Sequence, residues 1–263
     1  MLKQRFEKAF SQATAQTPEK ELIGTQNESL LHMTLKYFFE PNFCFHEQKL
    51  GKFFADIYRD GHITEIQTSK FFVMNGKLDF FLNEKDFSVE IVYPIAKRRF
   101  ISWMDPITGE ISDKKRGRRD NIYDVFTEIY GIRDFIASEK LSILIALVDI
   151  EEQKALNPRR KNPKSGARRV SRIPLGIDDI IYLETSEDYL QFIPEKLQGQ
   201  FTSKDFAVCA KIGRSLAQTT LNILTTLGIV MRIDRTKDGY VYQVCSRVCG
   251  DSVPSPLQSF EKD

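Results

Sequence analysis

Residues 53–68 read FFADIYRDGHITEIQT, and this stretch decides which fold the sequence predicts. Residues typical of β-strands stand on both sides of Asp60-Gly61, a dipeptide that favours a two-residue hairpin turn between antiparallel strands. Such a turn places Asp56 directly opposite Glu65 on one face of the hairpin, with Cβ atoms about 5 Å apart. The other face suits packing against a helix, since it carries Ala55, Ile57 and Ile66.

Two carboxylates that face each other across a strand pair repel, so the hairpin predicts a compensating cation. Mg²⁺ is typically held by one or two carboxylates and keeps waters and phosphate oxygens as its remaining ligands. There it polarises a scissile phosphate and activates water. Gln67, two residues after Glu65, points to the same side and can orient the water, although an amide cannot accept its proton. An exposed polar face with an accidental acid pair is the alternative interpretation.

Asp56, eight intervening residues and then Glu65-Ile66-Gln67 resemble the signature of the PD-(D/E)XK nucleases, in which an Asp and a Glu-x-Lys element lie on adjacent strands. The resemblance covers about Gly24 to Pro94. It implies a restriction-endonuclease-like α/β fold, a mixed sheet flanked by helices whose elements follow the order αβββαβ. It also implies that Asp56 and Glu65 bind Mg²⁺ or Mn²⁺, and that Glu28 or Glu47 contributes a third acid.

The sequence departs from the nuclease signature at Gln67, where most members of the superfamily carry Lys. Some branches resemble active enzymes with Gln at this place, but the substitution also fits an inactivated binding domain. Lys77, on the next helix, is a candidate for the role of the missing lysine, although a lone helix lysine is more often solvated. His32 and His46 stay outside the predicted catalytic set, because a lone His near an apolar face is more often a packed residue.

The elements around the hairpin follow from hydrophobic periodicity and turn residues. The pattern predicts a helix over 26–40 that Pro41 ends, with Leu30, Leu31, Leu35 and Phe38 on one face. It further predicts a strand over 43–50, a helix over 69–82, a buried strand over 89–95, an edge strand with a basic loop over 98–120, an amphipathic helix over 121–138, a fully covered strand over 141–150 and a linker or loop over 157–174.

The formal net charge is only +2, but the basic residues are clustered. One cluster spans 97–99, a second spans 114–119, and a third spans 154–172, where no acid interrupts the lysines and arginines. Local positive charge of this kind fits a polyphosphate partner, since each neutralised phosphate releases counterions. A solvated loop is the alternative for any single cluster. In the third cluster, the residues expected to contact nucleic acid are Arg159, Arg160, Arg168 and Arg169.

Residues 201–244 resemble a winged helix-turn-helix domain, with helices over 204–210 and 215–227 before a hairpin whose turn, 237–239, is the wing. Gly228 is expected to close the second helix in the left-handed conformation. The resemblance implies that this helix enters the DNA major groove. The expected contacts come from its polar face and from the wing: Arg214, Gln218, Thr219, Asn222, Arg232, Arg235 and Lys237. A winged helix used only for protein contacts is the alternative.

The composition is typical of a soluble globular protein, with 41% hydrophobic residues, 28% charged residues and a mean hydropathy of −0.33. No run approaches the roughly 18 apolar residues that a membrane span needs, so no membrane partner is expected. The N-terminus alternates charged and apolar residues, unlike a secretory signal. The four cysteines form no CxxC pair and are expected to be reduced thiols in a cytoplasmic protein.

Together these patterns predict a nuclease domain over 1–155, a basic connecting segment over 156–200, and a winged-helix domain with a tail over 201–263. The predicted function is Mg²⁺- or Mn²⁺-dependent hydrolysis of phosphodiester bonds in DNA, with RNA as the alternative substrate and a homodimer as an open arrangement. A catalytically inactive nucleic-acid-binding regulator on the same scaffold is the alternative function. A structural or scaffolding protein is a third interpretation, and it leaves the basic loops without a role.

Overall fold

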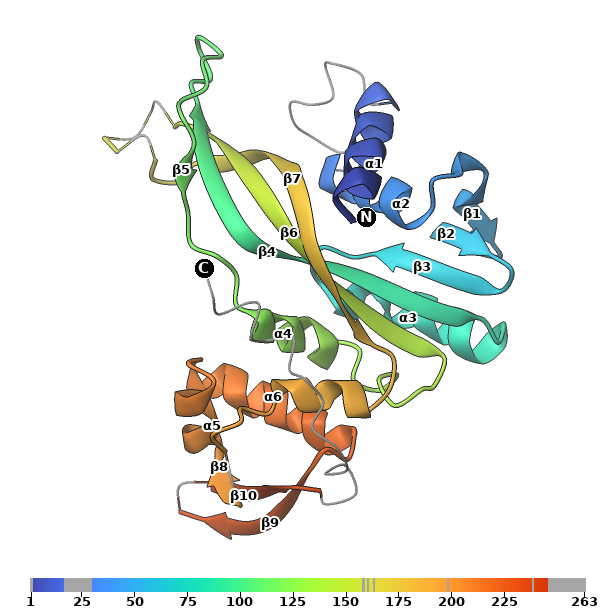
Figure 1. The fold of residues 1–263 in the computed structure, drawn as a ribbon, viewed down its shortest axis with the longest axis vertical. Coiled ribbons are helices and arrows are strands. Elements are labelled where there is room, and N and C mark those ends of the chain that lie inside the picture. The colour runs from blue at the N-terminus through green and yellow to red at the C-terminus, as the bar shows by residue number, and fades with distance from the viewer. Residues whose placement is uncertain are drawn as a thin grey trace. The chain divides into compact units, whose positions relative to one another are not determined.

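A computed structural model describes residues 2–16, 30–157, 159, 161–162, 164–197, 199–237 and 239–245. The chain is a mixed α/β protein with a seven-stranded sheet flanked by helices and a smaller three-stranded sheet (Figure 1). This architecture confirms the coarser part of the predicted fold class, a mixed sheet flanked by helices, while the restriction-endonuclease-like topology stays a prediction. Three residues named above, Glu28, Arg160 and the turn residue Asp238, lie outside the described residues.

Six α-helices are present in the described part of the chain: α1 (Leu2–Gln16), α2 (Leu30–Phe39), α3 (Asn75–Asp79), α4 (Val125–Tyr130), α5 (Ser203–Cys209) and α6 (Arg214–Thr226). Shorter turns of helix are η1 (Phe43–Phe45), η2 (Phe71–Met74), the π-helix η3 (Phe80–Glu84), η4 (Ile122–Asp124) and η5 (Glu187–Phe192). The strands are β1 (His46–Leu50), β2 (Phe53–Arg59), β3 (His62–Ile66), β4 (Ser88–Met104), β5 (Lys115–Arg116), β6 (Leu141–Ala155), β7 (Arg168–Leu183), β8 (Gln200–Thr202), β9 (Val230–Thr236) and β10 (Gly239–Val244).

The large sheet has the strand order β1-β2-β3-β4-β6-β7, with β5 paired to β4, and the small sheet has the order β8-β10-β9. The chain forms two compact units. The first comprises Met1–Thr68, Pro94–Asp120 and Ala146–Ile180, and the second comprises Ser69–Tyr93, Asn121–Ile145 and Ile181–Asp263. The predicted boundaries at residues 155 and 200 stay a prediction.

Helix α2 buries its apolar face as the sequence predicts. Leu31, Leu35 and Phe38 are fully buried, and α1 packs against α2 in the same unit. The two helices are joined by Arg5, whose guanidinium lies 4.6 Å from the Phe38 ring centroid and donates to the Phe38 carbonyl at 2.6 Å. Burying each large apolar side chain contributes about 1.5–3 kcal/mol, so this face holds α2 in place.

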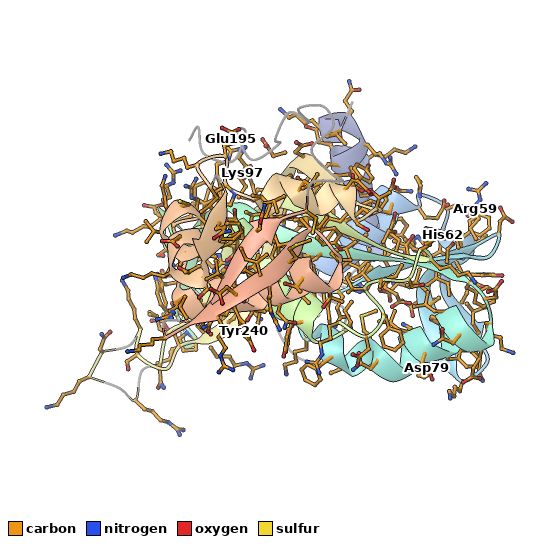
Figure 2. The ribbon with its side chains drawn as sticks, turned by 90° about the horizontal axis from the view of Figure 1, so that it is seen from below. Arg59, His62, Asp79, Lys97, Glu195 and Tyr240 are labelled. Atoms are coloured by element: carbon orange, nitrogen blue, oxygen red, sulfur yellow. The ribbon has the colours of Figure 1, made fainter. Side chains whose placement is uncertain are left out.

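The predicted hairpin is formed by β2 and β3. Asp60 and Gly61 both have positive φ, 51° and 84°, the combination that a type I′ turn requires. Arg59 and His62 lie together at the tip of the hairpin (Figure 2). The predicted register is confirmed by the pairs Arg59↔His62, Tyr58↔Ile63 and Ile57↔Thr64.

The prediction of a short buried strand over 89–95 followed by a separate edge strand is wrong. A single strand, β4, runs without a break from Ser88 to Met104. The predicted basic loop begins only after this strand, and two of its residues form β5 against Phe100 and Ile101. Alternating burial at the start of β4 and half-exposure at its end explain why the sequence looked like two strands.

The amphipathic helix predicted over 121–138 is shorter than expected. It begins at η4 and α4 and ends at Tyr130, after which hydrogen bonds such as Ile132 N to Ile129 O are of the tighter i→i−3 type. Gly131 lets the backbone approach Phe72 closely at this point, since an added Cβ would lie 3.0 Å from the Phe72 backbone nitrogen. The apolar residues after Tyr130 therefore lie in turns rather than in a helix.

The linker predicted over 157–174 is correct only up to Ala167. From Arg168 the chain enters β7, which pairs with β6 in the large sheet. Its first five residues are Arg, Arg, Val, Ser and Arg, and the three charged side chains give this part of the strand the composition of a loop. Two of the predicted nucleic-acid contacts, Arg168 and Arg169, are therefore strand residues.

The C-terminal part has the helix, helix and hairpin order that the sequence predicts. Thr202 caps α5 in a capping box with Asp205, and this hydrogen bonding lowers the pKa of the Asp205 carboxyl. Gly228 follows α6 with φ +73°, the expected left-handed cap. Strand β8, which the sequence analysis missed, adds a third strand to the hairpin. The winged-helix assignment itself stays a prediction.

Among the described residues, no helix is long and apolar enough to cross a membrane. Cys44 is exposed, and Cys209 and Cys245 are half-buried, each as a free thiol. Cys249 lies outside the described residues.

Candidate functional site

Three acids occupy neighbouring register positions on three adjacent strands. The pairs His46↔Ile57 and Gln48↔Ala55 put Glu47 on β1 across from Asp56 on β2. The hairpin pairs end at Ile57↔Thr64, and the same register carried on by one residue puts Asp56 across from Glu65 on β3. We call Glu47, Asp56 and Glu65 the acid row. Because sheet neighbours are spaced by less than 5 Å, like charges in such a row repel unless they are compensated.

The central acid of the row is fixed by two contacts within its unit. One carboxylate oxygen of Asp56, Oδ2, accepts a hydrogen bond of 2.7 Å from the Ile66 backbone N–H. The same oxygen lies 3.2 Å from Nε2 of His32 on α2. The hydrogen bond from Ile66 ties the Asp56 side chain to the backbone of β3. The Asp56 side chain is 18% exposed, so solvent and small ligands reach it.

The outer two acids of the row have opposite environments. Glu65 is buried at 3% exposure, whereas the Glu47 side chain is 52% exposed. Glu47 has a φ of 49°, an uncommon value for a non-glycine residue, and its carboxylate binds the buried Lys36 ammonium at 2.5 Å. The Glu47 carboxylate is therefore held by Lys36. Glu28, the other residue predicted as a third acid, lies outside the described residues.

Two basic residues of α2 contact the acid row, and the sequence analysis did not assign a role to either. His32 and Lys36 stand four residues apart, so they lie one turn apart on the same side of the helix. They contact Asp56 and Glu47, respectively. The signal was present in the sequence as basic residues at an i, i+4 spacing within an apolar helix. His32 was expected to be a packed residue, and Lys36 was not singled out.

Gln67 and Lys77 are the two residues considered for the position of the signature lysine. Gln67 is half-buried and follows β3 directly, two residues after Glu65. Lys77 belongs to the second compact unit, where its ammonium lies 5.9 Å from the Phe81 ring centroid. This cation–π contact explains the position of Lys77 without a catalytic role.

The donor set of the acid row fits a hard divalent cation bound by few protein ligands. In the part of the chain that the structure describes, no group of three or more His, Cys, Asp or Glu side chains could hold a metal ion. A zinc-like site with a full set of protein ligands is therefore not formed by these residues. Two carboxylates, Asp56 and Glu65, match the one or two that Mg²⁺ usually takes from a protein, with phosphate oxygens and water completing its shell.

The predicted nucleic-acid contacts lie on exposed parts of both units. Arg159 and Arg168 are exposed in the first unit. On α6, Arg214 and Gln218 are exposed, while the Thr219 hydroxyl donates to the Ser215 carbonyl at 3.2 Å and is used within the helix. Asn222 is half-buried one turn after Gln218.

The hairpin of β9 and β10 presents an aromatic ring between two arginines. The Arg232 guanidinium lies 4.6 Å and that of Arg235 5.5 Å from the Tyr240 ring centroid. Tyr240 is 40% exposed, and Figure 2 labels it on β10. Lys237, at the turn, is also exposed. Aromatic and guanidinium groups in contact are a surface on which nucleic-acid bases and phosphates are commonly bound.

Comparisons with known proteins place the acid row within a recognised family region. A family model described as "Domain of unknown function (DUF8091)" matches residues 29–184. An "Uncharacterized protein" of Treponema pallidum (strain Nichols) is 26% identical over 186 residues, which cover 70% of this chain and 73% of the relative. No solved structure matches the chain. The matched family region contains α2, the acid row and strands β4, β6 and β7, but not α5 to β10.

Proposed function

Since this chain belongs to the family described as a domain of unknown function (DUF8091), we propose its function from the site: metal-dependent hydrolysis of phosphodiester bonds in DNA. The observation that carries the proposal is the placement of Asp56 and Glu65 at neighbouring positions on adjacent strands, beneath a helix that contacts Asp56. Nucleases that the sequence resembles use an Asp and a Glu placed in this way.

The order of elements supports the same proposal. Helix α2 is followed by the three antiparallel neighbours β1, β2 and β3, then by the helical segment from η2 to η3, and then by β4 next to β3 in the sheet. This is the order αβββαβ that the resemblance implies. The acids on β2 and β3 consequently stand in the strands that carry the nuclease signature.

Each residue of the site has a separate role in the proposed reaction. Asp56 and Glu65 hold a divalent cation, which supplies charge stabilisation and activation of water when it is bound. His32 orients the Asp56 carboxylate through the contact at Oδ2. Gln67 orients the attacking water by hydrogen bonding but takes no proton from it. Because Gln67 replaces the usual lysine, proton transfer passes to solvent or to a phosphate oxygen of the substrate.

The C-terminal helices and hairpin serve in this proposal as a winged helix that binds the substrate. The exposed Arg214 and Gln218 of α6 enter the DNA major groove in this proposal. The Arg232–Tyr240–Arg235 group with Lys237 contacts phosphates and bases. The family match ends before these elements, which supports a targeting role that is separate from the chemistry.

The metal assignment is tested by isothermal titration of Mn²⁺ into the wild type and into Asp56→Ala. We expect binding in the wild type and at least about a tenfold loss of affinity in the variant, because one of two carboxylate ligands is removed. Asp79→Ala is the matched control, since Asp79 is an exposed acid of the second unit (Figure 2). Equal Mn²⁺ affinity in all three proteins would show that the acid row is not a metal site.

One observation favours the catalytically inactive regulator as a second candidate function. His32 and Lys36 already contact two of the three acids, so the row can be stabilised by protein groups alone. Together with Gln67, this arrangement fits a scaffold that binds nucleic acid without cutting it. A protein of this kind would bind DNA with the same affinity in Mg²⁺ and in EDTA and would cleave none.

A further inference from the structure

A nearly buried carboxylate on β6 is surrounded by cations from three strands. The Glu152 side chain is 6% exposed, and four basic groups lie within 4 Å of its oxygens. We call these four residues the cationic cage. Their distances to Glu152 are 3.8 Å for Arg99 Nε, 3.7 Å for Lys154 Nζ, 3.8 Å for Arg169 Nη1 and 3.5 Å for Arg172 Nε.

The cage has more positive than negative charge. Besides Glu152, the acid in contact with the cage is Asp120, which binds Arg99 Nη2 at 2.5 Å. Four cations against two carboxylates leave two positive charges in a small volume. An acidic group of a ligand is therefore attracted to the cage, and the attraction is strengthened by the reduced solvent exposure of the site.

Neighbouring cations on the same strand are paired in a different way. Lys97 donates to Asp178 at 2.7 Å. Arg98 forms a bidentate salt bridge with Asp149, in which Nε donates to Oδ1 at 2.8 Å. Each of these cations has its own acid at hydrogen-bonding distance. Of the cage residues, Arg99 also has an acid of its own in Asp120, whereas Lys154, Arg169 and Arg172 share Glu152 at distances of 3.5–3.8 Å, longer than those pairs.

Two donor atoms of the cage are buried and form no hydrogen bond. The Nε atoms of Arg99 and Arg172 have no hydrogen-bond partner in the described part of the chain. Both atoms lie near Glu152 Oε1 without forming a hydrogen bond to it, and phosphate oxygens are well suited to accept from guanidinium groups. The pKa of the Arg172 guanidinium is lowered, first by burial and then by the charge of Arg169, and the negative charge of a bound anion would oppose this lowering.

The basic side chains of the cage are partly exposed to solvent. Its side chains range from 22% exposure for Arg99 to 52% for Arg169. They are held on β4, β6 and β7, three strands of one sheet, which fixes their relative positions before a ligand arrives. Arg168 at the start of β7 and Arg159 in the preceding loop are further exposed basic residues of the same unit.

We propose that the cationic cage binds a phosphate group of a nucleic-acid backbone, with Arg99 and Arg172 donating to its oxygens. The proposal rests on the proposed function for the choice of ligand. The role of the cage is to hold the strand by its backbone, independently of sequence and of the divalent cation at the acid row. Glu152 limits the positive charge of the empty site and keeps the arginines apart.

The test measures binding of a fluorescent single-stranded oligonucleotide to the full chain in EDTA, over a series of salt concentrations. Arg169→Gln and Arg172→Gln are each expected to reduce the magnitude of the negative slope of log affinity against log salt by about 1. This is the change for one lost phosphate contact. Arg133→Gln, an exposed arginine paired with its neighbour Asp134, is the matched control and should leave the slope unchanged. Arg169 is half-exposed, so its variant retains the fold even if Arg172→Gln does not.

Glu152→Gln separates a binding site from a structural ion-pair network. We expect about fivefold tighter binding, the factor given by one unit charge about 4 Å away even in the dielectric of water. Unchanged or weaker binding in Glu152→Gln, or an unchanged salt slope in Arg169→Gln, would overturn the proposal. Displacement of the oligonucleotide by inorganic phosphate at an equal concentration of phosphate groups would also overturn it, since the ligand would then be free phosphate. Because EDTA prevents cleavage, these outcomes do not depend on whether the protein is a nuclease.

Discussion

Glu65→Gln is expected to reduce the rate of metal-dependent DNA cleavage by at least about a hundredfold while leaving DNA binding nearly unchanged. The substitution keeps the shape of a side chain that is only 3% exposed and removes its charge, so a metal ligand is lost and the packing is kept. Single-turnover rates with Mg²⁺ and with Mn²⁺ measure the effect on the chemical step. Glu195→Gln makes the same change at an exposed position, which Figure 2 labels, and should cut at the wild-type rate.

Substitutions of Gln67 refine this expectation. Gln67→Ala should slow cleavage less than Glu65→Gln does, because it removes the orientation of water but not a metal ligand. Gln67→Lys restores the commoner residue of the nuclease signature and should keep or raise the rate. If Glu65→Gln cuts as fast as the wild type, the hairpin is not the active site. If only Gln67→Lys cuts, the natural protein is a binder on a nuclease scaffold.

Phe192→Ala is expected to lower the free energy of unfolding by about 3–5 kcal/mol, the usual cost of removing a buried aromatic ring. Phe192 is fully buried in the second unit, and its ring packs edge-on against Phe126 with centroids 4.8 Å apart. Tyr123 lies beside it and donates its hydroxyl to the Phe192 carbonyl at 3.0 Å. The ring therefore joins η5 to the segment that contains η4 and α4.

Urea denaturation of Phe192→Ala and of Phe54→Ala measures this effect. Phe54 is 54% exposed on β2, so the same chemical change there should cost less than about 1 kcal/mol. Comparable losses in the two variants would show that the aromatic cluster does not stabilise the second unit. Phe206 of α5 also belongs to the cluster, with its ring centroid 6.0 Å from that of Tyr123. The C-terminal helices are thus packed on residues far earlier in the chain.

The parts of the fold that local chemistry determines were predictable from the sequence. The turn at Asp60-Gly61 and the alternation of its flanks fixed the register of β2 and β3, because a two-residue loop permits one pairing. The apolar face of α2 and the left-handed cap at Gly228 follow from equally local rules. The run over 141–150 also became a buried strand, within the longer β6.

The parts that depend on contacts between distant residues were not predictable. The polar start of β7 is a strand because β6 offers it a partner, and the helix after Asn121 stops where Gly131 meets Phe72. At the site, no sequence pattern indicates that Glu47 adopts a positive φ and binds Lys36. The cationic cage combines residues from positions 99 to 172, so charge clustering along the chain indicated its sign but not its arrangement around Glu152.

The most direct test of the central claim is a cleavage assay of the wild-type protein on labelled single-stranded, duplex and branched DNA of one sequence. Each substrate is incubated with Mg²⁺, with Mn²⁺ and with EDTA, and Glu65→Gln is run beside the wild type. The account predicts that at least one substrate is cut with a divalent cation, that EDTA abolishes the cutting, and that Glu65→Gln loses it. DNA that is bound but left intact under every condition, or cut equally by wild type and Glu65→Gln, would contradict the account.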